Sequence, residues 1–224
     1  FAGRGWCEWM LLLPAAIPAY IIAYTYTDFF EYAGPVQTAL RGFFGWQSAR
    51  DYWFPEIRSL GGATLVMASV LYPYIYMVTR IAFRLTSASL FEIALVHNKS
   101  QFWTVGLPLA RPAIMAGLAL VLMEVVSDFG TVEYFAIETI TLGIFNVWLG
   151  MNNIFAAAQI SLVGFVFILS LLGLELYARS RQQFANTARS QAPLVRLRIG
   201  PAGKTCCYLA CITPLVFGFI IPVG

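Results

Sequence analysis

The few acidic side chains of this sequence lie in or beside long apolar runs. Glu124 lies inside the apolar run 113–127, and Asp128, Glu133 and Glu138 follow it with no Lys or Arg between them. An ionisable group within a membrane-spanning segment is costly and usually faces a polar cavity or a partner. The pattern predicts a polar path past Glu124, Asp128 and Glu133 that attracts cations. The alternatives are that Glu124 is a helix-end group and that the other acids belong to an ordinary solvated loop.

Other residue types that carry chemistry are not spaced for it. The single histidine, His97, is far in sequence from the four cysteines, and no CxxC pair is present. The cysteines fit small apolar positions in membrane helices better than a zinc site or a disulfide framework. The run 200–205, GPAGKT, ends like a phosphate-binding loop, but Arg198 stands where the first glycine is required. We therefore expect no cofactor, no metal site and no catalysis of bond chemistry by this chain.

Composition indicates the class of protein that must position these acids. The 224 residues are 59% apolar and only 11% charged, and the mean hydropathy is +0.73. A typical soluble domain carries about 25% charged residues, so these charges are too few to cover a globular surface. The chain is therefore predicted to be an all-α, polytopic membrane protein. Because it does not begin with Met and its ends fall in apparently structured regions, we expect it to be a fragment of a longer chain.

Five apolar segments are predicted to span the membrane. Pro14 and Pro18 fall within the first segment, where neighbouring groups in a bundle can satisfy the freed carbonyls, and Pro73 is expected to kink the second. A short interfacial helix is predicted at 35–44, and the connection after Ser127 is apolar enough for another. The five segments are 9–24, 60–78, 113–127, 154–176 and 205–223.

The charges of the connections predict the orientation. The connections 80–112 and 179–204 hold ten Lys or Arg residues in all, whereas 25–59 and 128–153 hold three. Basic connections are retained in the cytoplasm. Alternation then places 80–112 and 179–204 inside and the acidic connections outside. We expect 179–204 to contact anionic lipid or to set topology rather than to bind nucleic acid.

The basic connection 80–112 has internal order that suits contact with a soluble partner. Residues 85–96 are predicted to form an interfacial helix capped by Thr86, and 101–106 a short turn that Leu107-Pro108 stops. Pro112 is expected to begin the next membrane helix, where its missing N–H is harmless. On these grounds we interpret the connection as the place where an ATPase acts on the chain.

The same connection resembles a known family. Glu92-Ile93-Ala94 and the run 105–112, VGLPLARP, are similar to the EAA loop of ABC importer permeases. The runs SDFG at 127–130 and YAGP at 32–35 look like the ferric-iron permease group, which is built as two homologous halves. The sequence departs from the motif at Ile93, where alanine is usual, and the expected glycine is absent, with Asn98 or Leu95 standing near its position.

The resemblance implies a fold and a mechanism. The fold is a transmembrane helical bundle, with residues 1–178 belonging to the first permease half, 179–204 to a basic cytoplasmic linker, and 205–224 to the first helix of the second half. The connection 80–112 becomes the coupling loop, which sits in a cleft of the ATPase. Glu92 is the candidate anchor; the alternative is that it only caps or solvates an interfacial helix. The implied coupling residues are Glu92, Ala94, Asn98, Val105, Gly106, Leu107 and Pro108.

The resemblance also implies partners and a location. A multi-pass permease of the bacterial inner membrane works with a cytoplasmic ATP-binding subunit, in two copies, and with a periplasmic substrate-binding protein. The expected cargo is ferric iron. The alternatives are another small solute (thiamine, phosphonate, sulfate, molybdate or a polyamine), or a secondary transporter or channel without an ATPase.

Overall fold

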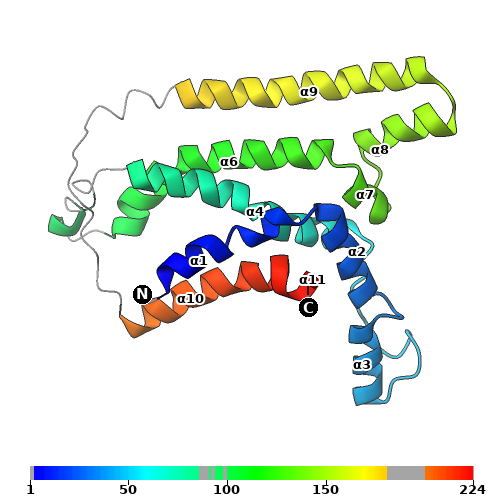
Figure 1. Ribbon diagram of the computed structural model, residues 1–224, viewed down its shortest axis with the longest axis horizontal. Coiled ribbons are helices and arrows are strands. Elements are labelled where there is room, and N and C mark those ends of the chain that lie inside the picture. Colours follow the sequence, from blue (N-terminus) through cyan, green and yellow to red (C-terminus); the bar gives the residue numbers. More distant parts are fainter. Residues whose placement is uncertain (1–2, 86–90, 92–93, 98–99, 181–199, 224) are drawn as a thin grey trace.

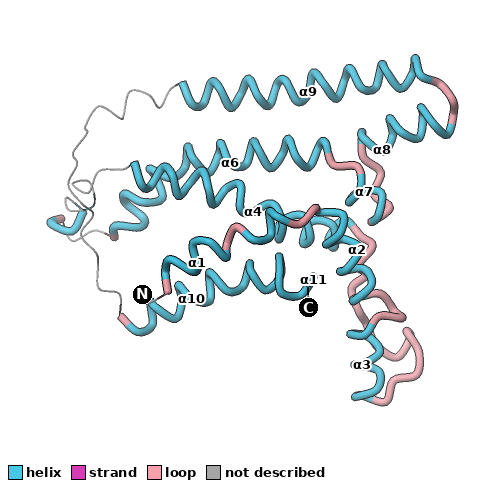
Figure 2. The backbone as a smooth tube through the Cα atoms, in the orientation of Figure 1, coloured by secondary structure: helices cyan, strands magenta, loops and turns pink. Residues whose placement is uncertain are grey.

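The computed structural model describes residues 3–85, 91, 94–97, 100–180 and 200–223, and every regular element in those ranges is helical (Figures 1 and 2). Four helices are long and apolar enough to cross a membrane: 60–84, 102–127, 154–174 and 201–223. At 1.5 Å per residue they are about 31–39 Å long, which matches or exceeds the ~30 Å hydrocarbon core. The predicted all-α, polytopic architecture is confirmed.

The long helices alternate in direction, as the charges of the connections predicted. Helix α4 (Leu60–Leu85) runs toward the end of the bundle where the chain starts, α6 (Leu107–Ser127) runs away from it, α9 (Ile154–Ser180) returns, and α10 (Pro201–Leu215) leaves again (Figure 1). Helix α10 continues through the π-helical segment η5 (Val216–Ile220) into α11 (Ile221–Val223). Pro73 lies inside α4 without ending the helix.

The predicted span 9–24 is wrong as a single helix. Helix α1 (Arg4–Met10) and the 3-10 turn η1 (Leu13–Ala16) form one arm, α2 (Ala19–Phe30) and α3 (Pro35–Phe44) form another, and the two arms meet at 87°. The break falls at Ile17-Pro18, because a residue before proline is pushed out of the helical region; Ile17 is extended, with φ −106° and ψ 126°. The chain therefore has four straight spans, or five if the bent pair counts as one.

Helix α3 has the predicted bounds because its ends are marked in the sequence. Pro35 is in the first turn, where its missing N–H costs nothing, and Gly45 ends the helix in the left-handed region with φ +71°. The apolar connection after Ser127 is also helical, as predicted. It contains α7 (Gly130–Tyr134), α8 (Ile140–Phe145) and the π-helical segment η3 (Asn146–Gly150).

Small residues set the packing of the two central helices. Ala110, Ala113, Ala116 and Gly117 are the buried residues of α6. A Cβ at Gly117 would lie 2.6 Å from the Cα of Ile75, so only glycine allows α4 and α6 to approach this closely. Helix α9 packs beside α6 and α8, with Ala157 buried and Gly164 against Ile140.

The largest buried cluster joins elements at the end opposite the N-terminus. It consists of Ile22, Ala23, Tyr26, Ala63, Val66, Val70 and Phe135, contributed by α2, α4 and the residue that follows α7. Near it, Arg58 pairs with Glu31 at 2.5 Å and donates to the carbonyl of Tyr134 at 3.0 Å. This end of the bundle is therefore held by both apolar and polar contacts.

Candidate functional site

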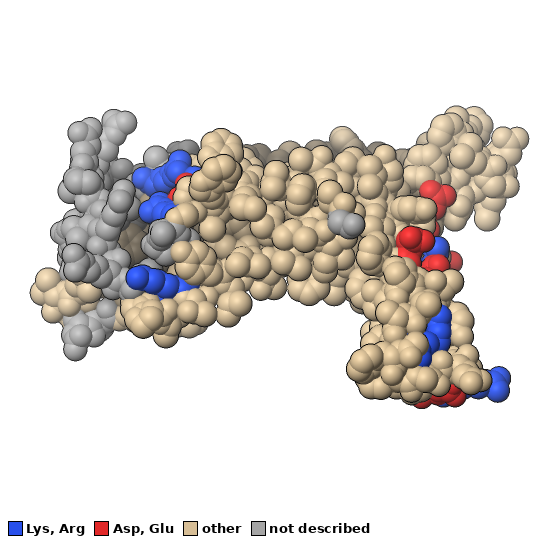
Figure 3. All heavy atoms as spheres, turned by 60° about the horizontal axis from the view of Figure 1, so that its bottom comes forward, with Lys and Arg blue, Asp and Glu red and all other residues tan. Residues whose placement is uncertain are grey.

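Charged side chains gather at the two ends of an apolar body (Figure 3). One end holds Arg80, Arg84, Arg111 and Lys204 on α4, α6 and α10, and the other holds Asp128 and Glu133 around α7. The first is called the basic end and the second the acidic end below. Of the predicted coupling residues, Val105, Gly106, Leu107 and Pro108 lie at the basic end of α6, and the predicted path residues lie toward the acidic end.

The predicted coupling loop, residues 80–112, begins and ends in helices, but not where the sequence predicted. The π-helical segment η2 (Phe102–Gly106) runs directly into α6, so Leu107-Pro108 does not stop it, and Pro112 lies inside α6 rather than at its start. The amide of Leu107 donates to the carbonyl of Phe102, five residues back, so the register widens just before Pro108. Since Pro108 has no N–H and its ring would press on the carbonyl four residues earlier, the wider turn accommodates it.

The predicted coupling residues have different environments. Ala94 and Gly106 are buried, and Val105, Leu107 and Pro108 are half-buried. Gly106 lies beside the ring of Phe83, since an added Cβ would be 3.8 Å from it. Glu92, Asn98 and the predicted cap Thr86 lie outside the described residues.

Large apolar side chains of this loop are exposed to solvent at the basic end. Leu95 is 50% exposed, Val96 83%, Phe102 58% and Trp103 68%. Exposed apolar side chains that gather at one place mark a partner or a membrane surface. Sequence reasoning centred on Glu92 and did not select Leu95, Phe102 or Trp103. Their presence between two spanning helices was the available signal.

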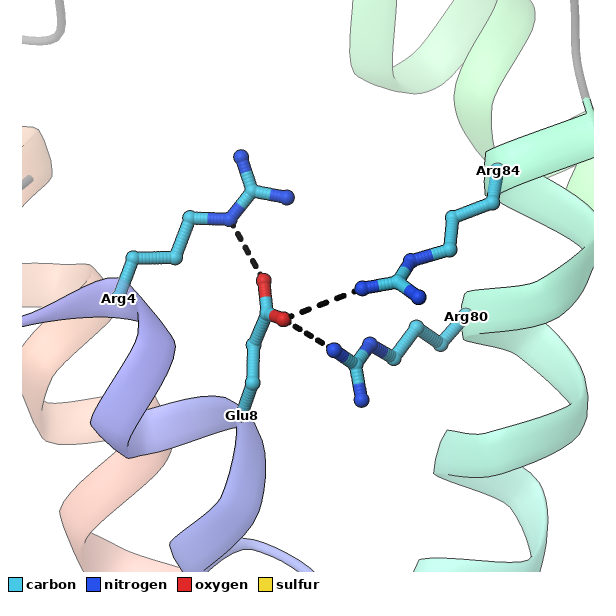
Figure 4. A network of polar contacts seen from close by, with 4 residues as sticks. All are labelled: Arg4, Glu8, Arg80 and Arg84. Atoms are coloured by element: carbon cyan, nitrogen blue, oxygen red, sulfur yellow. Dashed lines mark hydrogen bonds and ion pairs between the residues drawn. The ribbon is translucent and has the colours of Figure 1, made fainter.

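A charged cluster that sequence reasoning also missed joins α1 to α4 at the basic end. Glu8 accepts from Arg4 at 2.7 Å and from Arg84 at 3.3 Å, and it pairs with Arg80 (Figure 4). Arg4 and Glu8 are four residues apart, as are Arg80 and Arg84, so each pair lies on one helix face. No local pattern links the two pairs, which are more than 70 residues apart in sequence.

At the acidic end, Asp128 makes hydrogen bonds to residues that follow it closely in sequence. Its carboxylate accepts from the amides of Thr131 at 2.8 Å and Val132 at 3.3 Å, and from the Thr131 hydroxyl at 3.0 Å. These are the free amides in the first turn of α7, so Asp128 caps this helix. Glu124 and Glu133 are exposed and make no ion pair with another described residue. The structure brings the three acids to one end without joining their carboxylates.

No metal-binding cluster is found within the described ranges, where no three His, Cys, Asp or Glu side chains lie close enough to share an ion. The four cysteines are not joined in disulfides.

Comparison with known proteins gives two relatives. The chain is 23% identical over 223 residues to the "Fe(3+)-transport system permease protein FbpB 2" of Haemophilus influenzae, covering 98% of this chain and 38% of the relative. It is 25% identical over 173 residues to the "Putative 2-aminoethylphosphonate transport system permease protein PhnU" of Salmonella paratyphi A, covering 74% of this chain and 58% of the relative. No family model matches the chain, and no solved structure matches it significantly.

The two relatives agree in class. Both are permease proteins of transport systems, and the matches extend over most of this chain. The resemblance to ABC importer permeases predicted from the loop is therefore confirmed. The chain spans about two fifths of the length of one relative and under three fifths of the other.

Proposed function

We propose that this chain is the membrane-spanning part of an ATP-driven importer permease of the bacterial inner membrane. The observation that carries the proposal is the similarity to transport-system permeases over 98% and 74% of the chain. The four long apolar helices support it, since a permease must surround a path across the bilayer. The chain performs no bond chemistry; ATP hydrolysis takes place in a separate cytoplasmic subunit, present in two copies.

The coupling loop receives the ATPase at the basic end. Basic connections stay in the cytoplasm, and the exposed Leu95, Val96, Phe102 and Trp103 offer an apolar surface there. Glu92 orients the loop in the cleft of the ATPase. Ala94, Asn98, Val105, Gly106, Leu107 and Pro108 shape the loop, and the burial of Ala94 and Gly106 is compatible with that role.

Ferric iron is the proposed cargo, delivered by a periplasmic binding protein to the acidic end. The name of the Haemophilus relative supports this choice, as do the acids Glu124, Asp128 and Glu133. The second candidate is 2-aminoethylphosphonate, which the name of the Salmonella relative favours. Both require the same architecture, because the binding protein selects the cargo.

The proposed organisation is one polypeptide that contains two permease halves. Residues 1–178 belong to the first half, 179–204 to a cytoplasmic linker and 205–224 to the first helix of the second. The length of the relatives is compatible with a second half beyond this region. The close packing of η5 on α4 supports a fixed contact between the halves, since a Cβ at Gly218 would lie 2.4 Å from the Ser69 carbonyl oxygen.

Reconstitution tests the proposal. The complete permease, its ATP-binding subunit and a binding protein are placed in proteoliposomes, and ATP hydrolysis and uptake of radioactive iron or 2-aminoethylphosphonate are measured. We expect the ferric-loaded binding protein to stimulate both. Stimulation by the phosphonate-loaded protein alone selects the second cargo, and uptake driven by an ion gradient without an ATPase overturns the proposal.

The role of Glu92 is tested in the same vesicles. Glu92→Arg should leave membrane insertion intact and uncouple hydrolysis from uptake, because it reverses the charge that orients the loop. Glu138→Arg, at the acidic end, is the control and should retain coupling. Full coupling in Glu92→Arg contradicts the proposed anchor.

A further inference from the structure

A cavity of about 590 Å³ opens at the basic end, among residues of α1, α4 and α6. It lies apart from the exposed apolar side chains of the coupling loop and from the acidic end, so the proposed function leaves it without a role. Its lining divides into a charged part and an apolar part.

The charged part carries a surplus of positive charge. Arg4, Arg80 and Arg84 face the single carboxylate of Glu8, which leaves two net positive charges. Each arginine gives one nitrogen to Glu8: Nε of Arg4, and Nη2 of Arg80 and of Arg84 (Figure 4). The other guanidinium N–H groups make no further hydrogen bond with a described side chain, so they remain available to an anion. The Arg80 guanidinium also lies over the ring of Tyr76, 5.9 Å from its centroid. The side chains of Arg4 and Arg84 are 65% and 61% exposed, so an anion can reach them from outside.

The remaining lining is apolar and aromatic. Ile75, Phe83 and Ile114 line the cavity together with the rings of Tyr72 and Tyr76. Thr79 also lines the cavity, and the hydroxyls of Tyr72 and Thr79 are buried without a hydrogen-bond partner among the described residues. A buried hydroxyl without a partner costs free energy, so a ligand that reaches these groups would offset that cost.

We propose that this cavity binds one anionic phospholipid, with the phosphate among Arg4, Arg80 and Arg84 and an acyl chain along Ile75, Phe83 and Ile114. A guanidinium fork suits phosphate oxygens, and basic pockets between membrane helices bind anionic head groups. A free phosphate ion would fill only the charged part and leave the apolar wall against water. The proposal requires that the chain lies in a membrane, and it does not depend on which solute the chain transports.

Lipid binding tests whether the site prefers an anionic headgroup. The complete protein is purified in detergent and stripped of lipid before the measurement. Native mass spectrometry compares phosphatidylglycerol with phosphatidylcholine for the wild type and for an Arg4→Gln/Arg84→Gln variant, which keeps the Glu8–Arg80 pair. We expect the wild type to prefer phosphatidylglycerol. Each arginine near an anionic surface contributes roughly fivefold in affinity, so the double variant should lose roughly 25-fold. Equal binding of both lipids to the wild type overturns the proposal.

Two further variants separate local charge from general charge. Arg111→Gln removes an exposed arginine at the same end that does not line the cavity, and should leave the affinity unchanged. Glu8→Gln raises the local surplus from two to three positive charges, and should increase the affinity by roughly fivefold. A loss in Arg111→Gln equal to the loss in the double variant places the lipid elsewhere.

The acyl chain is tested at Ile114. Ile114→Trp should fill the apolar wall and weaken phosphatidylglycerol binding, while Ile114→Met, of similar volume, should not. Thermal unfolding checks that both variants are folded. If the tryptophan variant is not folded, competition between inorganic phosphate and phosphatidylglycerol for the wild type decides between a lipid and a free anion. Competition at millimolar phosphate, or unchanged lipid binding in a folded Ile114→Trp, identifies a site for a free anion and refutes the lipid.

Discussion

The hydroxyl of Tyr26 donates a hydrogen bond of 2.5 Å to the carbonyl of Phe217, 191 residues further along the chain. Tyr26 is 1% exposed and belongs to the largest buried cluster. Phe217 lies in the π-helical segment η5, whose wider turn changes the usual pairing of carbonyls. One buried hydroxyl therefore fixes the last described helix against α2.

Tyr26→Phe should destabilise the protein. The substitution keeps the ring and removes the donor, leaving a backbone carbonyl without this partner, at a cost of about 1–2 kcal/mol. Thermal unfolding of the purified protein in detergent measures it. The control is Tyr20→Phe, because Tyr20 is 54% exposed. Equal unfolding temperatures for the two variants would contradict the structural role of the bond.

Gly218→Ala should also loosen the last helix. A Cβ there would lie 2.4 Å from the Ser69 carbonyl oxygen and 2.8 Å from Cγ of Pro14, and neither backbone nor proline ring can move aside cheaply. We expect a loss of about 1–3 kcal/mol. Gly173→Ala in α9, which meets nothing within 4 Å, is the matched control and should be neutral or stabilising. Chemical denaturation of both variants gives the comparison.

Asp128 can be tested for capping separately from any role in the path. Asp128→Ala removes the acceptor at the start of α7 and should cost about 1 kcal/mol, whereas Asp128→Asn keeps an acceptor and should cost less. If a carboxylate in the path is also needed, Asp128→Asn should be stable and slow in uptake. Normal uptake by a stable Asp128→Asn would leave only the capping role.

The connection between α3 and α4 should respond to acid through Asp51. The amides of Ser48 and Gln47 donate to its carboxylate at 2.8 and 2.9 Å, and they hold the pKa of Asp51 below its usual value. Because the folded-state pKa is lowered, the stabilisation is present above the unfolded pKa of about 3.9 and is lost as pH falls through the folded value.

Carboxyl carbon labelling measures the Asp51 titration. The sequence has three aspartates, at 28, 51 and 128, so an NMR titration of labelled aspartate gives few signals. We expect the Asp51 midpoint to lie below 3.9 and to rise when Ser48 is replaced by proline, which removes one donating amide. A midpoint at or above 3.9 in the wild type would contradict the two hydrogen bonds from the amides of Gln47 and Ser48 to the Asp51 carboxylate.

Trp103→Ala tests the apolar surface of the coupling loop. Trp103 is 68% exposed, and truncation of a tryptophan that is a hot spot of an interface weakens binding by about 2 kcal/mol or more, about 30-fold. Co-purification with the ATP-binding subunit is the measurement. Trp148→Ala, 45% exposed in η3 at the other end, should leave the complex intact. Equal loss in both variants would indicate general damage, and no loss in either would place the ATPase elsewhere.

The sequence predicted the four straight spanning helices well because each is a long apolar run. The ends were less predictable, since α4 continues through Arg80 and Arg84 to Leu85, and apolarity alone does not show where a helix stops in the headgroup region. The sequence did not show that the helix would break before Pro18, because Pro73 and Pro112 lie inside helices that continue past them. Local sequence does not decide which proline the surrounding helices accommodate.

The functional surfaces were predictable only in part. The loop 80–112 was found from its charges, but Phe102 and Trp103 were passed over because their exposure depends on how η2 joins α6. Glu8 had no signal beyond its spacing from Arg4, since its other partners, Arg80 and Arg84, come from a distant helix. Asp128 was selected as a path residue, and its capping bonds depend on the start of α7, which the sequence left undefined.

The sharp turn at Ile17-Pro18 constrains how the protein is made. A non-helical backbone at membrane depth is tolerated only where protein covers it. Here Pro14 is buried and contacts Gly218, and Ile17 packs on the cluster that includes Tyr26 and Val66. The first arm emerges from the ribosome long before Gly218 does. It must therefore stay in the bilayer or its interface, incompletely covered, until the last described helix is inserted. The N-terminal arm is thus the first part of this region to be synthesised and among the last to reach its final packing.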